Sequence, residues 1–416
     1  MRIIYTLFIH CYGLFIRLAT LFNVKARLWV DGRRGLFANL GEALKQVDRE
    51  KSPVIWFHAS SLGEFEQGRP IIEAFRKAYP ACKILLTFFS PSGYEVRKNY
   101  DQADWIFYLP LDTPGNARRW IGLVKPAAAI FIKYDFWFNF LGSLFRQNIP
   151  VYFVSAIFRP SQHFFRWYGG WFKSQLAGVA HFFVQNKESS MLLESIGLRN
   201  VTVSGDTRFD RVFAVASEKH SFPLIEQFIS GKRVFIGGST WKEDEALLFH
   251  LINHKELNLK FILAPHDPSP GRIQHILGQL DTKVVRYSEL TAQKARTADV
   301  LIIDSVGILA QLYQYATLAF IGGGFGAGIH NIQEPITYGV PVFFGPGYHK
   351  FKEAVDLFGQ GAVFSVTTAD ELVAKTARIL ADPDEYQHLS KLCRNYVDEN
   401  RGATSKIMHY FEGVFR

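Results

Sequence analysis

Short, almost continuously hydrophobic runs alternate with polar stretches of helical character from residue 53 onward, and this alternation restricts the fold more than any other feature. Parallel strands that helices cover on both faces are apolar throughout, whereas half-exposed strands alternate apolar and polar residues. The strand candidates are 54–58, 84–88, 105–108, 127–132, 151–154 and 181–184, then 233–236, 260–263, 283–286, 300–303, 318–321 and 340–344. Helical stretches such as 69–79, 187–196 and 242–253 lie between them. The pattern predicts an α/β protein with parallel sheets.

The strand candidates fall into two groups, separated by polar sequence around 207–231. The chain has 416 residues, which is more than one hydrophobic core usually holds, since a domain has roughly 150 residues. Two Rossmann-like domains are therefore predicted. The expected segments are a first helix with a basic linker at 1–34, an N-terminal domain at 35–206, a linker at 207–230, a C-terminal domain at 231–395, and a C-terminal helix at 396–416 that crosses back to the first domain.

Residues 3–22 are apolar over about the length that crosses a bilayer. The exceptions share one helical stripe: Thr6, His10, Gly13, Arg17 and Thr20. An arginine at the hydrocarbon centre costs about 3 kcal/mol, which favours a helix lying in the interface over one that spans. The cations that follow this stretch indicate that the bulk of the chain lies on the cytoplasmic side of the membrane: Lys25, Arg27, Arg33 and Arg34. The alternative is a buried first helix of a soluble domain.

The composition of the chain restricts the kinds of partner and compartment that it fits. Three widely spaced cysteines exclude a disulfide framework and fit a reducing compartment. A formal net charge of +9 favours an anionic partner, such as nucleic acid, anionic lipid or a phosphorylated substrate. An aromatic content of 15% is high for a soluble enzyme and points towards membrane contact.

The loop after the first strand candidate reads His-Ala-Ser-Ser-Leu-Gly-Glu at 58–64. Strand carboxyl ends face the ligand crevice of an open α/β sheet, so Glu64 is placed to act as a general base. Gly63 allows the backbone to approach a ligand closely. The alternative is that Glu64 only stabilises a helix N-terminus.

A second loop, at 321–335, contains five glycines and then His-Asn-Ile-Gln-Glu-Pro. It follows a strand candidate and leads into a helix, where backbone N–H groups can meet a phosphate. It lacks the Gly-Lys-Ser/Thr of a Walker A loop, and the acidic residue of a dinucleotide fingerprint is missing. Glu334 is a candidate for ribose hydroxyls and Asn331 for a phosphate or carboxylate. The alternative is a plain glycine-rich turn.

Cations and aromatics interleave over 158–173, where Arg159 and Arg166 stand among Phe, Trp and Tyr. That composition suits a membrane interface or single-stranded nucleic acid. No RNA-binding signature accompanies it, so lipid is favoured and nucleic acid is not expected; a partly buried aromatic helix is the alternative. The scattered histidines lack metal-ligand spacing, and no metal is predicted.

These motifs, taken in order, resemble the 3-deoxy-D-manno-octulosonic acid (Kdo) transferases of Gram-negative lipopolysaccharide synthesis. The resemblance runs over almost the whole chain. It rests on HASSLGE at 58–64, SGDTRFD at 204–210, GGSTWKEDE at 237–245, APHDP at 264–268, DSVGIL at 304–309 and GIHNIQEP…YGVPVFFGP at 328–346.

The resemblance implies a GT-B glycosyltransferase with two Rossmann-like domains that face a cleft, an acceptor-binding N-terminal domain and a CMP-Kdo-binding C-terminal domain. It implies inverting transfer of Kdo from CMP-Kdo to the lipid A precursor, without a metal or cofactor. Glu64 matches the catalytic base and Arg208 a transition-state cation. The matching donor contacts are Ser239, Thr240, Pro265, His266, Val306, Gly307, Ile308, Asn331, Ile332, Gln333 and Glu334. On the acceptor side we expect Ser60, Ser61, Gly63, Arg159 and Arg166.

Two departures from the family pattern stand out. The family's E-T-E-L-W-P-N reads Lys-Tyr-Asp-Phe-Trp-Phe-Asn at 133–139, so its first acid is Lys133 here while Asp135 keeps the second. Lys133 and Asp135 are both candidate catalytic residues. The family's Pro-Arg-His-Pro reads Pro-His-Asp-Pro at 265–268, which removes an arginine from the expected nucleotide site.

Attachment to the cytoplasmic face of the inner membrane completes this interpretation. A different GT-B sugar-nucleotide enzyme, such as a UDP-N-acetylglucosamine 2-epimerase, and a non-catalytic lipid-binding scaffold are the competing hypotheses. Dependence on lipid and turnover of CMP-Kdo distinguish them. The oligomeric state and the number of Kdo units transferred do not follow from the sequence.

Overall fold

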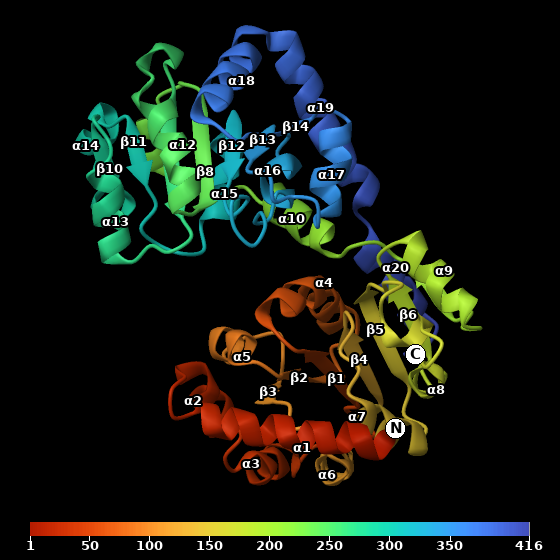
Figure 1. Ribbon diagram of the computed structural model, residues 1–416. Helices are drawn as coiled ribbons and strands as arrows, with labels where there is room; N and C mark the ends of the chain where they lie inside the picture. The colour runs from red at the N-terminus through yellow and green to blue at the C-terminus, as the bar shows by residue number, and fades with distance from the viewer. Residues whose placement is uncertain (416) are drawn as a thin grey trace. The chain divides into compact units, whose positions relative to one another are not determined.

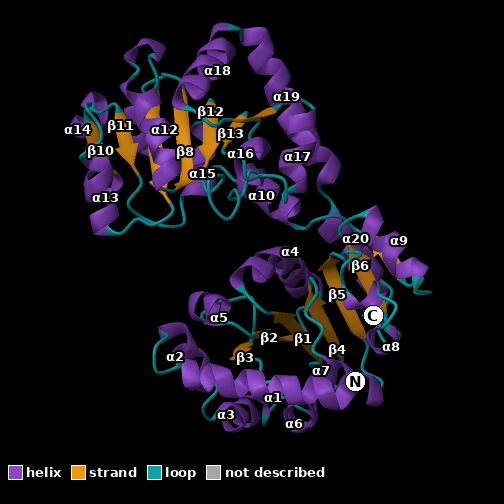
Figure 2. Cartoon of the chain, in the orientation of Figure 1, coloured by secondary structure: helices purple, strands orange, loops and turns teal. Residues whose placement is uncertain are grey.

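The computed structural model describes residues 1–415 and divides into two compact units (Figure 1). The first unit is Met1–Asp210 together with the chain from Arg401 onward, and the second is Arg211–Asn400. Each unit is built on one seven-stranded sheet whose strands are all parallel, with helices on both faces (Figure 2). The predicted α/β class with two Rossmann-like domains is confirmed.

The first sheet has the strand order β3-β2-β1-β4-β5-β6-β7. Its strands are β1 (Val54–Ala59), β2 (Lys83–Phe88), β3 (Trp105–Tyr108), β4 (Ala128–Ile132), β5 (Val151–Ala156), β6 (His181–Val184) and β7 (Val201–Val203). The helices of this unit are α1 (Arg2–Ala19), α2 (Val24–Asp31), α3 (Leu36–Leu44), α4 (Leu62–Ala78), α5 (Pro91–Arg97), α6 (Pro114–Val124), α7 (Phe138–Arg146), α8 (Gly170–Leu176), α9 (Lys187–Ser195) and α20 (Ala403–Glu412), with a 3₁₀ turn η1 (His163–Phe165).

The second sheet has the order β10-β11-β9-β8-β12-β13-β14. Its strands are β8 (Val234–Thr240), β9 (Lys260–Pro265), β10 (Val284–Arg286), β11 (Val300–Ile302), β12 (Leu318–Ile321), β13 (Val342–Phe344) and β14 (Val363–Ser365). Its helices are α11 (Pro223–Ile229), α12 (Lys242–Asn253), α13 (Pro270–Leu277), α14 (Ala292–Thr297), α15 (Leu309–Leu312), α16 (Gln333–Thr337), α17 (Lys352–Gly359), α18 (Ala369–Ala381) and α19 (Pro383–Asn400), with 3₁₀ turns η2 (Lys255–Leu257), η3 (Tyr287–Glu289) and η4 (Tyr313–Tyr315).

Strand β1 shows why the hydrophobic runs are continuous. Its six residues are all buried. Val54 and Trp56 belong to the core on one face of the sheet, and Ile55 and Phe57 belong to the core on the other. Successive side chains of a strand point to opposite faces, so a strand between two helix layers has no position that faces solvent. The edge strands β7 and β14, of three residues each, were not among the strand candidates.

The region 207–230, expected as a linker, is largely helical. It contains most of α10 (Arg208–Ser217) and all of α11. Phe209, Ile225 and Phe228 are buried, so both helices have an apolar face to pack. The C-terminal stretch is broken between α19 and α20 at Gly402, whose φ of +98° is left-handed. Asp210 accepts hydrogen bonds from the backbone N–H groups of Gly402 (2.5 Å) and Thr404 (2.6 Å) and holds the start of α20 in the first unit.

Helix α1 lies along the first unit and packs on the loops that follow β2, β3 and β4 (Figure 1). Within residues 1–415 it is the one helix long and apolar enough to cross a membrane, judged by length and composition. Ile9 and Gly13 are buried, whereas Phe8, Phe15 and Leu18 are among its exposed apolar side chains. The predicted polar stripe therefore does not face one environment, because Gly13 turns towards the protein and His10 and Arg17 towards solvent.

Candidate active site

Glu64 stands in the first turn of α4, directly after the carboxyl end of β1. Its Oε2 accepts hydrogen bonds from the Ser61 backbone N–H (2.9 Å) and the Ser61 hydroxyl (3.2 Å). No donor among residues 1–415 reaches Oε1. Glu64 therefore caps the helix with one oxygen and presents the other, and the structural and catalytic interpretations are compatible. A Cβ on Gly63 would meet no heavy atom of residues 1–415 within 4 Å outside its chain neighbours, so the backbone before Glu64 is not packed against the protein on that side.

Asp135 follows β4, the neighbour of β1 in the sheet, and so reaches the same edge. Its Oδ2 accepts from the Ser60 backbone N–H at 3.0 Å. Burial, and then the negative charge of Glu64, raise the pKa of Asp135 to about 7, against the lowering effects of the Ser60 hydrogen bonds and of Lys133. Asp135 therefore keeps its proton up to a much higher pH than an exposed aspartate does.

His58 lies next to Asp135 and helps to position it. Its Nε2 accepts from the Trp137 indole N–H at 3.0 Å and lies 3.6 Å from Asp135 Oδ2. Its Nδ1 lies 2.9 Å from the hydroxyl of Thr87. Complete burial lowers the pKa of His58 to about 3, so the ring is neutral. Because Nε2 accepts a hydrogen bond, Nδ1 carries the ring proton and donates a hydrogen bond to the Thr87 hydroxyl. The histidine is a positioning group in a closed network.

Lys133 has a φ of +69°, in the left-handed region that a residue with a side chain adopts at a cost. It is half-buried next to the carboxyl end of β4, where its N–H donates to the Val154 carbonyl at 2.8 Å. Burial lowers the pKa of Lys133, the charges of Arg208 and Arg159 lower it further, and Glu64 raises it. Lys133 is therefore a cation close to the two carboxylates, in a position whose backbone is strained.

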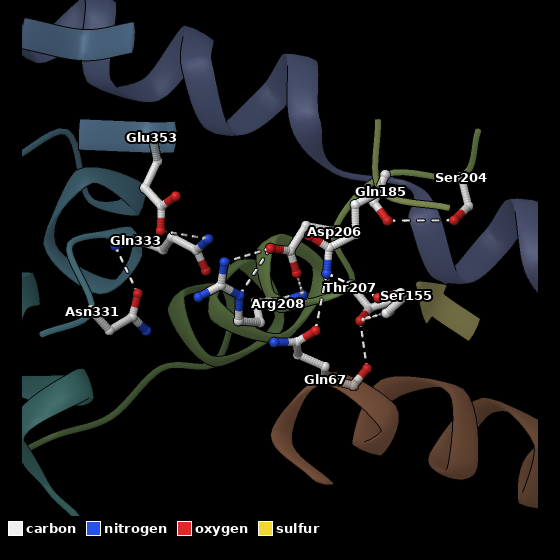
Figure 3. A network of polar contacts seen from close by, with 11 residues as sticks. Gln67, Ser155, Gln185, Ser204, Asp206, Thr207, Arg208, Asn331, Gln333 and Glu353 are labelled. Carbon is white, nitrogen blue, oxygen red and sulfur yellow. Dashed lines mark hydrogen bonds and ion pairs between the residues drawn. The ribbon is translucent and has the colours of Figure 1, made fainter. Parts of the chain in front are cut away.

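Arg208 begins α10 and pairs with Asp206, through Nε at 2.9 Å and Nη2 at 2.6 Å. Thr207 lies between them in a buried network (Figure 3). Its hydroxyl lies 2.8 Å from the hydroxyl of Ser155 and donates to the Gln67 carbonyl. Gln185 closes the network by donating to Gln67 Oε1 at 3.0 Å. The segment that carries Arg208 is thus fixed to α4 and β5, and the guanidinium is oriented by Asp206.

The two loop arginines expected to contact the acceptor differ in their surroundings. Arg159 is exposed and its charge reaches Lys133. Arg166 lies further along the exposed turn, where Nε donates to the Ser161 carbonyl at 3.5 Å. Next to it, Trp167 has 95% of its surface exposed. Phe164 and Phe172 of the same segment pack on each other and on the core, so the segment is part core and part surface.

The second unit has a hollow of about 320 Å³ at the carboxyl ends of β8, β9 and β12. Trp241, His266 and His330 line it, and their rings are nearly parallel. The ring centroid of His266 lies 4.4 Å from that of Trp241 and 4.6 Å from that of His330. Trp241 Nε1 donates to His330 Nε2 at 3.0 Å. Burial, and then the charge of His266, lower the pKa of His330, so this ring accepts the bond as neutral imidazole.

The glycine-rich loop forms the rest of this hollow. A Cβ on Gly322 would lie 2.3 Å from the Ser239 carbonyl oxygen, so only glycine fits against the end of β8. Asp244 Oδ2 accepts from the backbone N–H groups of Gly323 and Trp241, each at 2.8 Å. Its other oxygen, Oδ1, is buried without a partner at the wall of the hollow. A buried acceptor without a donor is a place where a ligand hydroxyl or amine gains a hydrogen bond.

The segment 331–334 is organised by its own side chains. Asn331 Oδ1 accepts from the Gln333 backbone N–H at 3.0 Å, and Asn331 Nδ2 donates to Glu334 Oε1 at 3.3 Å. Gln333 is buried and donates to Glu353 at 3.3 Å (Figure 3). The helix that follows, α16, has five residues, so the glycine loop does not lead into a long helix with a strong dipole. Ile332 is buried.

Of the other expected donor contacts, Ser239, Thr240 and Pro265 lie at the same strand ends, whereas the 306–308 loop follows β11. Ser239 has a φ of +53°, a second strained residue beside a strand terminus. Thr240 is buried and its hydroxyl donates to Glu245 at 3.0 Å, so it supports the fold. Pro265 ends β9. The loop of Val306, Gly307 and Ile308 precedes α15, and Val306 is 82% exposed.

The sequence pattern alone left His58, His266 and His330 as scattered histidines; the family resemblance added His266 as a donor contact, but it did not single out Trp241, Trp137 or Asp244. The available signal was positional, because Trp241, His266 and His330 each follow a strand, and β9, β8 and β12 are neighbours in the sheet. Among residues 1–415, no group of three His, Cys, Asp or Glu side chains is arranged to hold a metal ion.

Comparison with solved structures identifies the class. The chain is similar to UDP-N-acetylglucosamine 2-epimerase from Neisseria meningitidis, with a TM-score of 0.60 and 15% identity over 86% of this chain and 98% of that one. It is also similar to MurG from Acinetobacter baumannii, with a TM-score of 0.53 and 11% identity over 87% and 99% of the two chains. At these identities the likeness concerns the fold alone, which is the GT-B arrangement of two Rossmann-like units.

The sequence comparisons are narrower. Residues 33–211 match the family model described as 3-deoxy-D-manno-octulosonic-acid transferase (kdotransferase). The 3-deoxy-D-manno-octulosonic acid transferase of Bordetella pertussis is 26% identical over 92% of this chain and 94% of its own length. That of Aquifex aeolicus is 28% identical over 79% of this chain and 86% of its own. The chain is thus similar to Kdo transferases over most of its length.

Proposed function

We propose that this protein transfers Kdo from CMP-Kdo to the lipid A precursor in lipopolysaccharide core synthesis, with inversion at the anomeric carbon. The observation that carries the proposal is Glu64, whose Oε2 is held by Ser61 while Oε1 accepts no hydrogen bond from residues 1–415. A carboxylate oriented in this way can take a proton from an attacking hydroxyl. Similarity to Kdo transferases over most of the chain supports this choice of donor and acceptor class.

In the proposed reaction, Glu64 removes the proton of the acceptor hydroxyl as its oxygen attacks the anomeric carbon of Kdo. The bond from that carbon to the CMP phosphate breaks, and CMP leaves with the electron pair. Asp135, with its pKa of about 7, and the cation Lys133 adjust the charge around the base. Arg208, oriented by Asp206, is the cation assigned to the developing negative charge.

We assign the donor to the hollow of the second unit. The ring stack of Trp241, His266 and His330 offers a flat surface to a pyrimidine or a sugar, and the free oxygen of Asp244 offers an acceptor. Asn331 and Glu334 are within the same loop and are assigned to polar groups of CMP-Kdo, together with Ser239 and the 306–308 loop. His266 and its neighbours stand where the family pattern has an arginine.

We assign the acceptor to the first unit, with Ser60, Ser61, Gly63 and Arg159 nearest the reacting hydroxyl and Arg166 on the adjoining turn. Helix α1 would lie flat in the cytoplasmic face of the inner membrane, with its exposed apolar side chains in lipid. Trp167 is a second apolar contact, because indole rings favour the membrane interface. This attachment keeps the enzyme at the surface where an acylated acceptor resides.

The decisive experiment combines the purified full chain, CMP-Kdo and tetraacylated lipid A precursor, and weighs the products by mass spectrometry. The expected result is an acceptor heavier by one or more Kdo units, with equal release of CMP and no loss of activity in a chelator. Incubation with UDP-N-acetylglucosamine tests the epimerase alternative. Conversion of that sugar, or CMP-Kdo left intact in the presence of acceptor, would overturn the proposal.

A further inference from the structure

A hollow of about 460 Å³ runs beside the N-terminal half of α1, and its walls are almost entirely apolar. It is lined by Arg2, Ile3, Thr6, Leu7, His10 and Pro114. Ile3 has 85% of its surface exposed and Leu7 63%, so these side chains border the hollow without being covered by the protein. An open apolar groove on the helix assigned to the membrane has the shape and chemistry for a hydrocarbon chain.

Three arginines stand at the polar end of this groove. Arg2 lines the groove itself, Arg118 donates to the carbonyl of the lining residue Pro114 at 3.4 Å, and Arg146 belongs to α7. A Cβ placed on Gly142 would lie 3.5 Å from Arg146 Nη1 and 3.7 Å from Arg2 Nη2. The guanidinium groups of Arg2 and Arg146 therefore flank the same glycine, although 144 positions separate them in the chain.

These arginines have no acidic partner. Within residues 1–415, no carboxylate lies at ion-pair distance from Arg2, Arg118 or Arg146, and all three are exposed. Their side chains donate hydrogen bonds to neutral groups, such as Asn139 for Arg2 (3.5 Å) and Ser143 for Arg146 (2.9 Å). Partial burial, and then the charges of Arg2 and Arg118, lower the pKa of Arg146. The charge of Arg2 also lowers the pKa of the buried Asp112 from beyond ion-pair distance, but no ion pair with a carboxylate of residues 1–415 neutralises Arg118 or Arg146. Like charges held close together in this way favour an anion that joins them.

Phosphate monoesters and diesters are the anions that arginine clusters bind best, through paired N–H donors on a planar fork. We propose that Arg2, Arg118 and Arg146 bind the phosphate of one anionic phospholipid of the bilayer, and that an acyl chain of the same molecule lies in the groove along Ile3 and Leu7. This proposal rests on the membrane attachment of α1 proposed above. It adds a defined lipid site at one corner of the first unit, distinct from the residues around Glu64.

A diffuse basic surface is the competing explanation, and a matched variant separates the two. Arg17 and Lys25 are exposed cations at the other end of α1, so R17Q/K25Q removes the same charge as R118Q/R146Q from another place on the membrane face. None of the four side chains is assigned to the reaction. The probes are dioleoyl phosphatidylglycerol, which is anionic, and dioleoyl phosphatidylcholine, which has the same chains and a zwitterionic headgroup.

Binding is measured on the full chain in a non-ionic detergent by native mass spectrometry, which counts lipids per protein. The wild-type chain should bind one phosphatidylglycerol at least about tenfold more tightly than phosphatidylcholine, because charged hydrogen bonds are added. R118Q/R146Q should lose this preference, and R17Q/K25Q should keep it. A preference retained in R118Q/R146Q, or lost equally in both variants, would overturn the proposal.

A third arm identifies the source of the phosphate. An excess of lipid A precursor that displaces phosphatidylglycerol one for one would show that the groove belongs to the acceptor, and the phospholipid assignment would be wrong. Simultaneous binding of both lipids supports the proposal. No arm requires turnover, so failure of Kdo transfer and failure of the lipid site are separate results. Thermal unfolding of each variant confirms that the fold is retained.

Discussion

Tyr5 of α1 donates its phenolic hydroxyl to Asp112 Oδ2 at 2.6 Å, across 107 positions of the sequence. Asp112 is fully buried and also accepts from the backbone N–H groups of Asn139 (3.0 Å) and Phe140 (2.9 Å), which begin α7. One carboxylate therefore fastens the apolar helix to the first unit and caps a second helix. Helix α1 is at once part of this unit and the carrier of its exposed apolar surface.

The first prediction concerns this fastening. Tyr5→Phe removes one hydrogen bond to a buried carboxylate and should lower the free energy of unfolding by about 1.5–3 kcal/mol. Tyr12→Phe is the control, since Tyr12 contributes ring contacts on the same helix without a hydroxyl bond to Asp112. Thermal unfolding in detergent measures both. Equal stability of Y5F and the wild type would mean that α1 is held by apolar contacts alone.

Removal of the base tests the mechanism. Glu64→Gln preserves the bonds from Ser61 but cannot accept a proton, and kcat should fall at least about 100-fold with CMP affinity unchanged. Glu66→Gln on the same helix breaks a partly exposed ion pair with Arg97 and should leave kcat within about twofold. Single-turnover transfer of Kdo is the measurement. Near-normal turnover in E64Q would remove Glu64 from the reaction.

The raised pKa of Asp135 has a consequence for stability. Its pKa is about 7 in the folded chain and 3.8 when unperturbed, so between pH 4 and 7 the folded state holds a proton that the unfolded state releases. Stability is therefore lost through this group as pH rises across that window. Relative to the wild type, Asp135→Asn should gain about 1 kcal/mol per pH unit from pH 5 to 7 and then level off.

Urea unfolding at pH 5, 6, 7 and 8 measures this difference. Asp101→Asn, at an exposed position of the same unit, should show no such trend. A difference between D135N and the wild type that is constant from pH 5 to 8 would contradict a proton held on Asp135.

Lys133 offers a test of strain kept for function. Glycine adopts a φ of +69° without the Cβ clash, so Lys133→Gly should raise the free energy of unfolding by about 1 kcal/mol. The same change should reduce turnover, because the cation near Glu64 is lost. Lys125→Gly is the control: Lys125 has a φ of +44° at the exposed end of α6, and its variant should gain stability at full activity. Unchanged turnover in K133G would assign Lys133 no part in catalysis.

The ring stack predicts how CMP binds. Trp241→Ala removes a stacking surface and should weaken CMP at least about fivefold, the lower range of base stacking. Trp241→Phe keeps a ring over His266 but loses the N–H donated to His330, and it should retain most of the affinity. Trp167→Ala, on the exposed turn of the first unit, is the control. Calorimetry with CMP would contradict the assignment if W241A and W167A bind alike.

Much of this architecture could be predicted from local sequence. The two-sided burial of β1 requires every residue from Val54 to Ala59 to be apolar or internally bonded, and that pattern is visible in one dimension. The position of Glu64 after the first strand followed from the same reasoning, because the carboxyl ends of parallel strands meet at one edge. The sequence by itself determined the two sheets, their principal strands and the loops that carry the candidate site.

Only the tertiary structure decided which distant side chains meet. His58 is a positioning group because Trp137 reaches it from 79 positions away, and Trp241 becomes part of a site through His330, 89 positions away. The orientation of α1 depended on Asp112 in the same way. The hydrophobic periodicity of a segment indicates which of its residues face the core and which face solvent. It does not indicate which other segment they contact. Those contacts are set by the order of strands in the sheet and by the packing of helices over it, which exist only in three dimensions.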